Sequence, residues 1–217
     1  MTRATDSRLW RFDRDQRSGL EGLLAGVDEV GRGPLAGPVV AAAVVFFRSG
    51  RLAGLPAVGL AGLNDSKQLT PEAREKLFFP ILQHAMVGIG ISSEEDIDRL
   101  NIYQASRLAM RKAVLALPQT PSRLVIDGNM KLDLPLEQRA IVKGDQKSAC
   151  IAAASIVAKV YRDAWMCHLD RLYPGYFFYK HKGYSTALHL KALRACGPSP
   201  VHRRSFLPVA ELEMAHA

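Results

Sequence analysis

Apolar runs of strand length recur along the chain and are separated by polar segments. Five of them predict β-strands: Leu23–Val30, Val39–Phe47, Met86–Ile91, Arg123–Ile126 and Ala140–Lys143. The second run is charge-free and rich in valine, which is typical of an interior strand. The last two runs lead into carboxylates, Asp127 and Asp145. The pattern therefore predicts a sheet with acidic residues at the ends of two strands.

Longer segments between and after these runs predict helices. They are Pro71–His84, Glu94–Leu117, Lys147–Leu172 and Thr186–Cys196. Thr70 and Pro71 suit the N-cap and the first position of one helix, and Ser92 with Glu95 matches a capping box for the next. Strands come first and helices alternate with strands later. This order predicts an α/β fold, a mixed sheet flanked by helices with a helical C-terminal extension.

The boundaries of the folded part follow from where the apolar pattern begins and ends. Residues 1–20 mix arginine and aspartate and predict a polar N-terminal arm, disordered in part. Residues 21–208 form the predicted folded domain, and 209–217 a C-terminal tail. Residues 48–62 lack periodicity and predict a loop. No repeat, low-complexity segment or convincing linker divides the chain.

Length and charge narrow the classes of function. The chain has 217 residues, enough for one α/β domain, and a formal net charge of +8 that favours polyanionic partners. Its three cysteines are odd in number and lack Cys-x-x-Cys spacing, which argues against a disulfide framework or zinc site. No secretory signal or apolar run of membrane-spanning length is present. We therefore expect a soluble cytoplasmic protein, and charge alone leaves its partner open.

The most informative motif follows the first predicted strand, where Asp28 and Glu29 are succeeded at once by Gly31-Arg32-Gly33. Carboxylate oxygens attract hard divalent cations, and glycines beside an arginine allow close approach to a phosphate or ribose. An isolated Asp-Glu pair is most often a solvated strand end. Here the motif precedes Pro34–Pro38 and the uncharged run Val39–Phe47, a much rarer combination, and it suggests phosphoryl chemistry.

Asp127 and Asp145 can converge with this pair, because carboxylates at the ends of neighbouring strands meet in space. Such a four-carboxylate cluster repels itself unless divalent cations neutralise it, and two cations can serve an in-line phosphoryl displacement. One geometric difficulty remains, since adjacent strand residues point to opposite faces. We therefore expect Asp28 to be central, Glu29 to reach round the edge, and the strand to distort near Gly31 and Gly33.

Seven blocks of sequence in a fixed order resemble the type 2 ribonucleases H, specifically the bacterial ribonuclease HII family. They are Asp28–Gly33, Leu63–Thr70, Val125–Asn129, Val142–Asp145, Ala152–Asp163, His181–Tyr184 and His202–Phe206. The resemblance implies the ribonuclease H fold. It also assigns catalysis and metal binding to Asp28, Glu29, Asp127 and Asp145.

Substrate recognition is the second role that these blocks suggest. The Gly31-Arg32-Gly33 backbone can read a ribose 2′-hydroxyl, the group that separates RNA from DNA, and Tyr184 offers a flat face to the neighbouring deoxyribose. Ser185 departs from the Gly or Pro that we expect there in the family, which leaves this loop less certain. Candidate phosphate contacts are Ser66, Lys67, Lys143, Lys147, Lys180, Lys182, Arg203 and Arg204. The resemblance raises Lys67 and Lys143 above the rest, and we expect Asp163 to pair with Lys159.

The sequence as a whole predicts a monomeric, metal-dependent endonuclease acting on RNA–DNA hybrids and on ribonucleotides embedded in duplex DNA. It would cut on the 5′ side, leaving 3′-hydroxyl and 5′-phosphate ends. The all-oxygen ligands imply Mg²⁺ or Mn²⁺, two ions with substrate bound. Two alternatives stay open: another two-metal nuclease of the same superfold, such as a junction resolvase, and a non-catalytic nucleic-acid binder.

Overall fold

A five-stranded mixed sheet forms the centre of the computed structural model, which describes residues 3–47, 60–63 and 69–214. The strands are β1 (Leu24–Val30), β2 (Val39–Phe46), β3 (Ala85–Ser92), β4 (Arg123–Asp127) and β5 (Glu137–Ile141). Their spatial order is β3-β2-β1-β4-β5. The first three pair antiparallel, whereas β4 pairs parallel with both β1 and β5. The predicted mixed sheet is therefore confirmed, with β1 at its centre.

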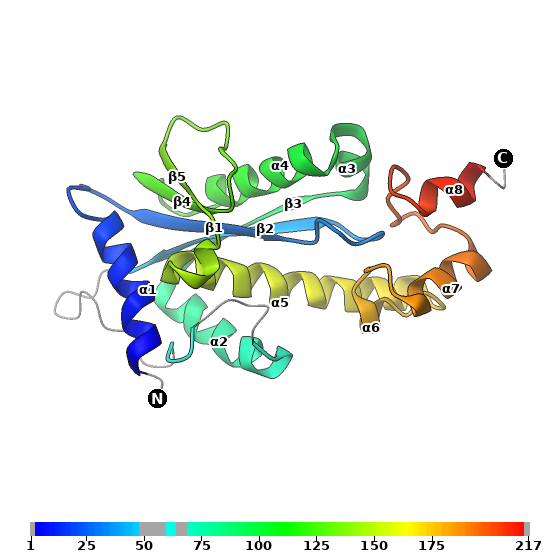
Figure 1. Cartoon of the computed structure of the whole chain (residues 1–217), viewed down its shortest axis with the longest axis horizontal. Coiled ribbons are helices and arrows are strands. Elements are labelled where there is room, and N and C mark those ends of the chain that lie inside the picture. Colours follow the sequence, from blue (N-terminus) through cyan, green and yellow to red (C-terminus); the bar gives the residue numbers. More distant parts are fainter. Residues whose placement is uncertain (1–2, 48–59, 64–68, 215–217) are drawn as a thin grey trace.

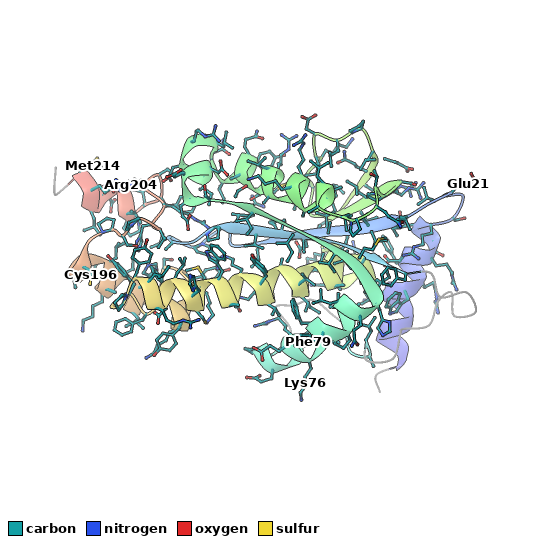
Figure 2. All side chains as sticks on the ribbon, turned by 180° about the vertical axis from the view of Figure 1, so that it is seen from behind. Glu21, Lys76, Phe79, Cys196, Arg204 and Met214 are labelled. Carbon is teal, nitrogen blue, oxygen red and sulfur yellow. The ribbon has the colours of Figure 1, made fainter. Side chains whose placement is uncertain are left out.

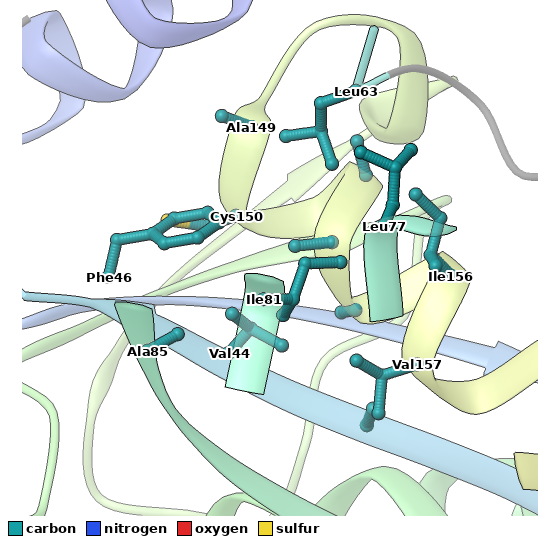
Figure 3. Packing of buried hydrophobic residues seen from close by; sticks show 14 of the residues in the cluster. Val44, Phe46, Leu63, Leu77, Ile81, Ala85, Ala149, Cys150, Ile156 and Val157 are labelled. Atoms are coloured by element: carbon teal, nitrogen blue, oxygen red, sulfur yellow. The ribbon is translucent and has the colours of Figure 1, made fainter. Parts of the chain in front are cut away.

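Helices cover both faces of this sheet (Figure 1). One face carries α3 (Glu94–Leu100) and α4 (Ile102–Leu115), and the other α2 (Pro71–His84) and α5 (Ala149–Leu172). The helix α4 approaches β3 closely, because a Cβ on Gly88 would lie 2.1 Å from the Ala113 carbonyl oxygen. Figure 3 shows the opposite core, where Leu77 of α2 packs with Ile156 and Val157 of α5.

The segment predicted as Glu94–Leu117 is two helices. Asn101 separates them at φ 71°, and its side chain accepts from the amides of Tyr103 and Gln104 to cap α4. The predicted N-cap of this segment, Ser92, lies one residue before the observed one. Ser93 caps α3, whereas Ser92 is buried and donates to the Ala105 carbonyl oxygen.

Two other element boundaries moved for a local reason. The last strand lies at Glu137–Ile141 instead of Ala140–Lys143, because Lys143 takes a left-handed conformation that ends it and starts the 3-10 turn η1 (Gly144–Gln146). Helix α5 then begins at Ala149 instead of Lys147, with the Ser148 hydroxyl accepting from the Ile151 amide. The Thr70 cap of α2 is confirmed.

The C-terminal part forms short helices at the far end of α5 (Figure 1). They are α6 (Phe178–His181), α7 (Ala187–Cys196) and α8 (Val209–Met214). Of these, α6 was not predicted, and α8 lies in the segment predicted as a C-terminal tail. A β-bridge between Ala36 and His202 joins this part to the turn after β1. Within the described residues, no helix is both long and apolar enough to cross a membrane. The cysteines Cys150, Cys167 and Cys196 are free.

The N-terminal segment differs from the predicted disordered arm, since Arg3–Gln16 forms helix α1. Leu9 is buried within the α5-side core, and the Trp10 ring lies 4.7 Å from that of Phe46. Asp13 is also buried, and its Oδ2 accepts from the Cys150 amide at 2.8 Å. The alternating charges concealed this buried stripe in the sequence, because Asp13 looked like one more solvated acid.

Removal of the Asp13 carboxylate should destabilise the fold. In Asp13→Ala the buried Cys150 amide at the start of α5 loses its acceptor, so the free energy of unfolding should fall by about 1–3 kcal/mol. Urea denaturation measures this change, and Asp15→Ala, at an exposed site on the same helix, is the matched control. Equal stability of the two variants would mean that α1 does not hold α5.

Candidate active site

The parallel register of β1 and β4 places two predicted catalytic carboxylates side by side. The ladder pairs Leu24 with Arg123 and continues to Val27 with Ile126, so the next residues in register are Asp28 and Asp127. Side chains at paired positions of neighbouring strands point to the same face. The two carboxylates therefore meet at the end of the ladder, as the sequence predicts.

Asp28 faces the α5 side of the sheet and is nearly inaccessible to solvent. Its antiparallel partner Ala42 belongs to the α5-side core, and Ser155 of α5 donates a hydrogen bond to its carboxylate. Burial, then the negative charges of Glu29 and Asp127, raise the pKa of Asp28 well above its usual range. The site therefore disfavours the ionised form unless a positive charge is supplied.

Glu29 points to the opposite face, as strand alternation requires. The expected distortion of β1 does not occur, because its pairing with β2 stays regular through Val30 and Val40. Burial raises the pKa of Glu29 to about 7, opposed by the charge of Arg32 and reinforced by that of Asp127. Arg32 Nη1 lies 3.4 Å from Glu29 Oε1. Glu29 thus shares the electrostatic neighbourhood of Asp127 from the other side of the strand.

The fourth carboxylate, Asp145, lies in the turn that supports Asp127. The Gly144 amide donates to Asp127 Oδ1 at 2.6 Å, and the next residue, Asp145, is buried within η1. The strand predicted to end near Asp145 ends at Ile141, and Asp145 lies in the 3-10 turn that follows. Lys143 precedes this turn and is exposed, so a basic residue directly precedes the Gly144 amide that binds Asp127.

The donor set suits a divalent cation in its chemistry. The candidate ligands are all carboxylate oxygens, and burial and mutual repulsion would both be relieved by a bound cation. Among the described residues, however, no three acidic, histidine or cysteine side chains stand at the spacing of metal ligands. Three of the carboxylates accept a hydrogen bond from the protein: Asp28 from the Glu29 amide, Glu29 from Arg32 and Asp127 from Gly144. These hydrogen bonds leave other lone pairs of the carboxylates available to a cation.

The predicted substrate-reading residues lie together beside this cluster. Arg32 and Gly33 are exposed, and a Cβ built on Gly33 would lie 3.9 Å from Cε1 of Tyr184. The Leu35 amide donates to the Gly183 carbonyl oxygen at 2.8 Å, which joins the two loops. Gly31 has φ 95°, and a Cβ there would come within 2.3 Å of Arg162 Nε. Only glycine fits that position.

Two buried arginines behind the loop were not recognised from the sequence. Arg203, a predicted phosphate contact, is fully buried and donates to loop carbonyls, so that prediction was wrong. Its neighbour Arg204 lies at the surface, near Met214, and pairs with Glu213 (Figure 2). A signal for Arg162 did exist. It shares a helical stripe with the buried residues Ala158, Met166 and Leu169.

Three histidines that lack metal-motif spacing form a buried cluster under Tyr184. The rings of His181 and His189 stack at 4.3 Å, and His189 Nε2 lies 3.1 Å from His202 Nε2. Burial lowers the pKa of His189 and of His202 to about 4. His189 Nδ1 lies 2.9 Å from the Tyr184 carbonyl oxygen, so neutral imidazole holds this loop.

Two further predictions concern residues around the site. The ion pair of Asp163 with Lys159 is confirmed, with Oδ1 2.7 Å from Nζ. Ser66 and Lys67 lie outside the described residues.

Known proteins share the sequence of this chain over most of its length. The ribonuclease HII family model matches residues 25–209. The chain belongs to the ribonuclease HII family. It is 52% identical over 205 residues to ribonuclease HII of Geobacillus kaustophilus, covering 94% of this chain and 75% of that protein. Against ribonuclease HII of Geobacter sulfurreducens it is 49% identical over 206 residues, covering 94% and 90%.

The fold agrees with this membership. The crystal structure of ribonuclease H2 from Pyrococcus horikoshii OT3 superposes with a TM-score of 0.72 at 26% identity, over 89% of this chain and 98% of that chain. The predicted ribonuclease H-like fold is thereby confirmed. The protein is an enzyme of the ribonuclease H class, an endonuclease that hydrolyses phosphodiester bonds.

The raised pKa of Glu29 predicts a pH dependence of stability in the metal-free protein. Its pKa is about 7 in the folded protein, against an ordinary value of 4.5, so the folded state holds a proton that the unfolded chain has released. The proton on Glu29 therefore contributes up to about 3 kcal/mol to the free energy of unfolding. This stability is fully present below the unfolded pKa of 4.5 and is lost as pH rises through 7. Glu29→Gln cannot ionise and should lose less stability between about pH 5 and about pH 8.

The measurement is urea denaturation in chelator across this pH range. Asp28 shifts in the same direction, so some slope should remain in the variant. Glu95→Gln, at an exposed site on α3, should follow the wild type. Identical pH slopes for Glu29→Gln and wild type would contradict the buried, repelling environment.

Proposed function

We propose that this enzyme is a metal-dependent endonuclease that hydrolyses the RNA strand of RNA–DNA hybrids and cuts 5′ of ribonucleotides embedded in duplex DNA. The supporting observation is the pairing of Asp28 with Asp127 close to the exposed Gly33 and Tyr184. A phosphodiester at the carboxylates would then have its ribose near the loop. Cleavage would leave 3′-hydroxyl and 5′-phosphate ends.

The carboxylates would hold Mg²⁺ or Mn²⁺, with two ions in the substrate complex. Asp28, Glu29, Asp127 and Asp145 would hold these ions. When bound, such cations supply Lewis acidity to an attacking water and to the leaving 3′ oxygen. The oxygen-only donor set supports this choice of metal. Hydrogen bonds from the protein orient two of these carboxylates: Ser155 donates to Asp28, and the Gly144 amide donates to Asp127.

Recognition of the substrate would divide between the loop and the basic surface. We propose that the Gly31-Arg32-Gly33 backbone reads the 2′-hydroxyl and that Tyr184 packs on the adjoining deoxyribose. Lys143, exposed at the start of η1, would contact phosphate, and we propose the same role for Ser66 and Lys67. The net charge of +8 supports a polyanionic substrate. We propose that the protein works in the cytoplasm, since its three free cysteines suit a reducing compartment. We also propose that it is a monomer.

A cleavage assay tests the proposal directly. It compares an all-DNA duplex with the same duplex carrying one ribonucleotide, and with a long RNA–DNA hybrid. The proposed enzyme cuts the last two, at the 5′ side of the ribonucleotide in the second. A junction resolvase would require a branched DNA, and a non-catalytic binder would cut none of them.

Loss of the Asp28 or the Asp127 carboxylate should remove cleavage but keep binding. Asp28→Asn or Asp127→Asn should retain less than about a tenth of wild-type kcat at saturating Mg²⁺, because a lost ligand removes several kcal/mol of transition-state stabilisation. Hybrid affinity should stay close to wild type, since phosphate contacts supply most of it. Asp133→Asn, at an exposed site, is the control. A larger residual kcat would count against the metal-ligand assignment.

Tyr184 should matter most where RNA meets DNA. We expect Tyr184→Ala to lower kcat/KM for a single embedded ribonucleotide far more than for a long hybrid, with Tyr184→Phe between them. Tyr179 is similarly exposed, at 46% against 41%, and Tyr179→Ala is the matched control. All assays use one salt concentration, because phosphate affinity depends steeply on salt. Equal losses on both substrates would make Tyr184 a structural residue.

A further inference from the structure

Two guanidinium groups lie fully buried behind the loop that follows β1. Arg162 comes from the middle of α5 and Arg203 from the segment after α7, and both have 0% exposure. Burial, and for Arg203 the like charge of Arg162, lowers the pKa of Arg162 to about 10 and of Arg203 to about 9. Both therefore stay protonated at neutral pH. Buried charges are costly unless they are well bonded.

Backbone carbonyls of the loop take up nearly all of these donors. Arg203 donates from Nη2 to the Gly31 oxygen at 2.5 Å, from Nη1 to the Arg32 oxygen at 3.0 Å, and from Nε to the Gly37 oxygen at 2.9 Å. Arg162 donates to the carbonyls of Ala36, Pro38 and Lys182. Among the described residues neither guanidinium forms an ion pair, so the loop backbone is its principal partner.

The direction of two carbonyls determines the direction of two amides. In a trans peptide the C=O of one residue and the N–H of the next point in opposite directions. The only cis bond in the described chain is Leu207–Pro208. Because the Gly31 and Arg32 carbonyls point inward to Arg203, the Arg32 and Gly33 amides point outward. Within the described chain no backbone acceptor pairs with them, and both residues are exposed.

We propose that Arg203 is a positioning residue for ribose recognition. By holding the carbonyls of Gly31 and Arg32, it aims the amides of Arg32 and Gly33 outward, beside Tyr184, as a pair of donors for a substrate oxygen. The inference rests on the proposed function and explains why a charged residue is buried there. Successive amides that point the same way form a concave donor site for an electron-rich group.

A lysine cannot replace this arginine. Its single ammonium group lacks the planar fork that reaches three carbonyls at once, although it keeps the charge. Arg203→Lys should therefore free the Gly31 and Arg32 peptides to rotate, and the outward donor pair would be lost. Nonspecific duplex affinity should be nearly unchanged, because Arg203 has no access to phosphate.

The test measures KM for a duplex with one ribonucleotide, and Ki for the all-DNA duplex as competitor. The ratio Ki/KM reports ribose preference and does not depend on the fraction of active protein. We expect Arg203→Lys to lower this ratio at least about tenfold, the loss of roughly 1.4 kcal/mol of discrimination. Arg194→Lys, at an exposed site on α7, should keep the ratio within about twofold of wild type.

The outcomes separate the two proposals. A wild type that does not cut the ribonucleotide duplex would overturn the proposed function, and the inference with it. A wild type that cuts this duplex with a ratio near one would overturn the inference alone. Wild-type preference that persists in a folded Arg203→Lys would overturn the inference alone. If this variant does not fold, NMR of the wild type decides: the Arg32 and Gly33 amide signals should shift with the ribonucleotide duplex and not with the all-DNA duplex. Unshifted amides would show that they are not the donors.

Discussion

The packing of α5 against β1 is the contact on which the site depends. Gly26 leaves room for it, because a Cβ there would come within 2.2 Å of the Cys150 carbonyl carbon. From that point the helix and the strand run alongside each other. The five residue steps from Gly26 to Gly31 rise about 17 Å as a strand, and the twelve from Cys150 to Arg162 rise about 18 Å as a helix. These nearly equal lengths account for the contacts of Ser155 with Asp28 and of Arg162 with Gly31. One helix thus serves both the carboxylates and the loop.

Buried charges of opposite sign lie on either side of a short turn. On one side the carboxylates of Asp28, Glu29 and Asp127 repel each other, and on the other Arg162 and Arg203 do the same. Neither group neutralises the other by a direct ion pair among the described residues. The carboxylates are suited to a cation, whereas the arginines are satisfied by backbone carbonyls. The repulsion of like charges therefore stays unrelieved mainly at the carboxylates, where chemistry would use it.

Much of the fold could be predicted because apolar runs report burial directly. The run Val39–Phe47 marked an interior strand, and Thr70 marked the start of a helix. Prediction failed where a polar residue was buried. Asp13 and Arg203 looked like solvated charges, although each bonds to backbone groups far away in sequence. The break at Asn101 was also missed, because a left-handed residue inside a helical pattern leaves little trace.

The sequence by itself determined the family and marked four acidic positions as candidates for the site, because both are written in residue types and their order along the chain. Only the tertiary structure decided which groups face each other. The β1–β4 register set Asp28 beside Asp127, regular pairing kept Glu29 on the other face, and Arg203 turned the loop amides outward. Such arrangements depend on strand register and on hydrogen bonds between distant segments, and local pattern carries no information about either.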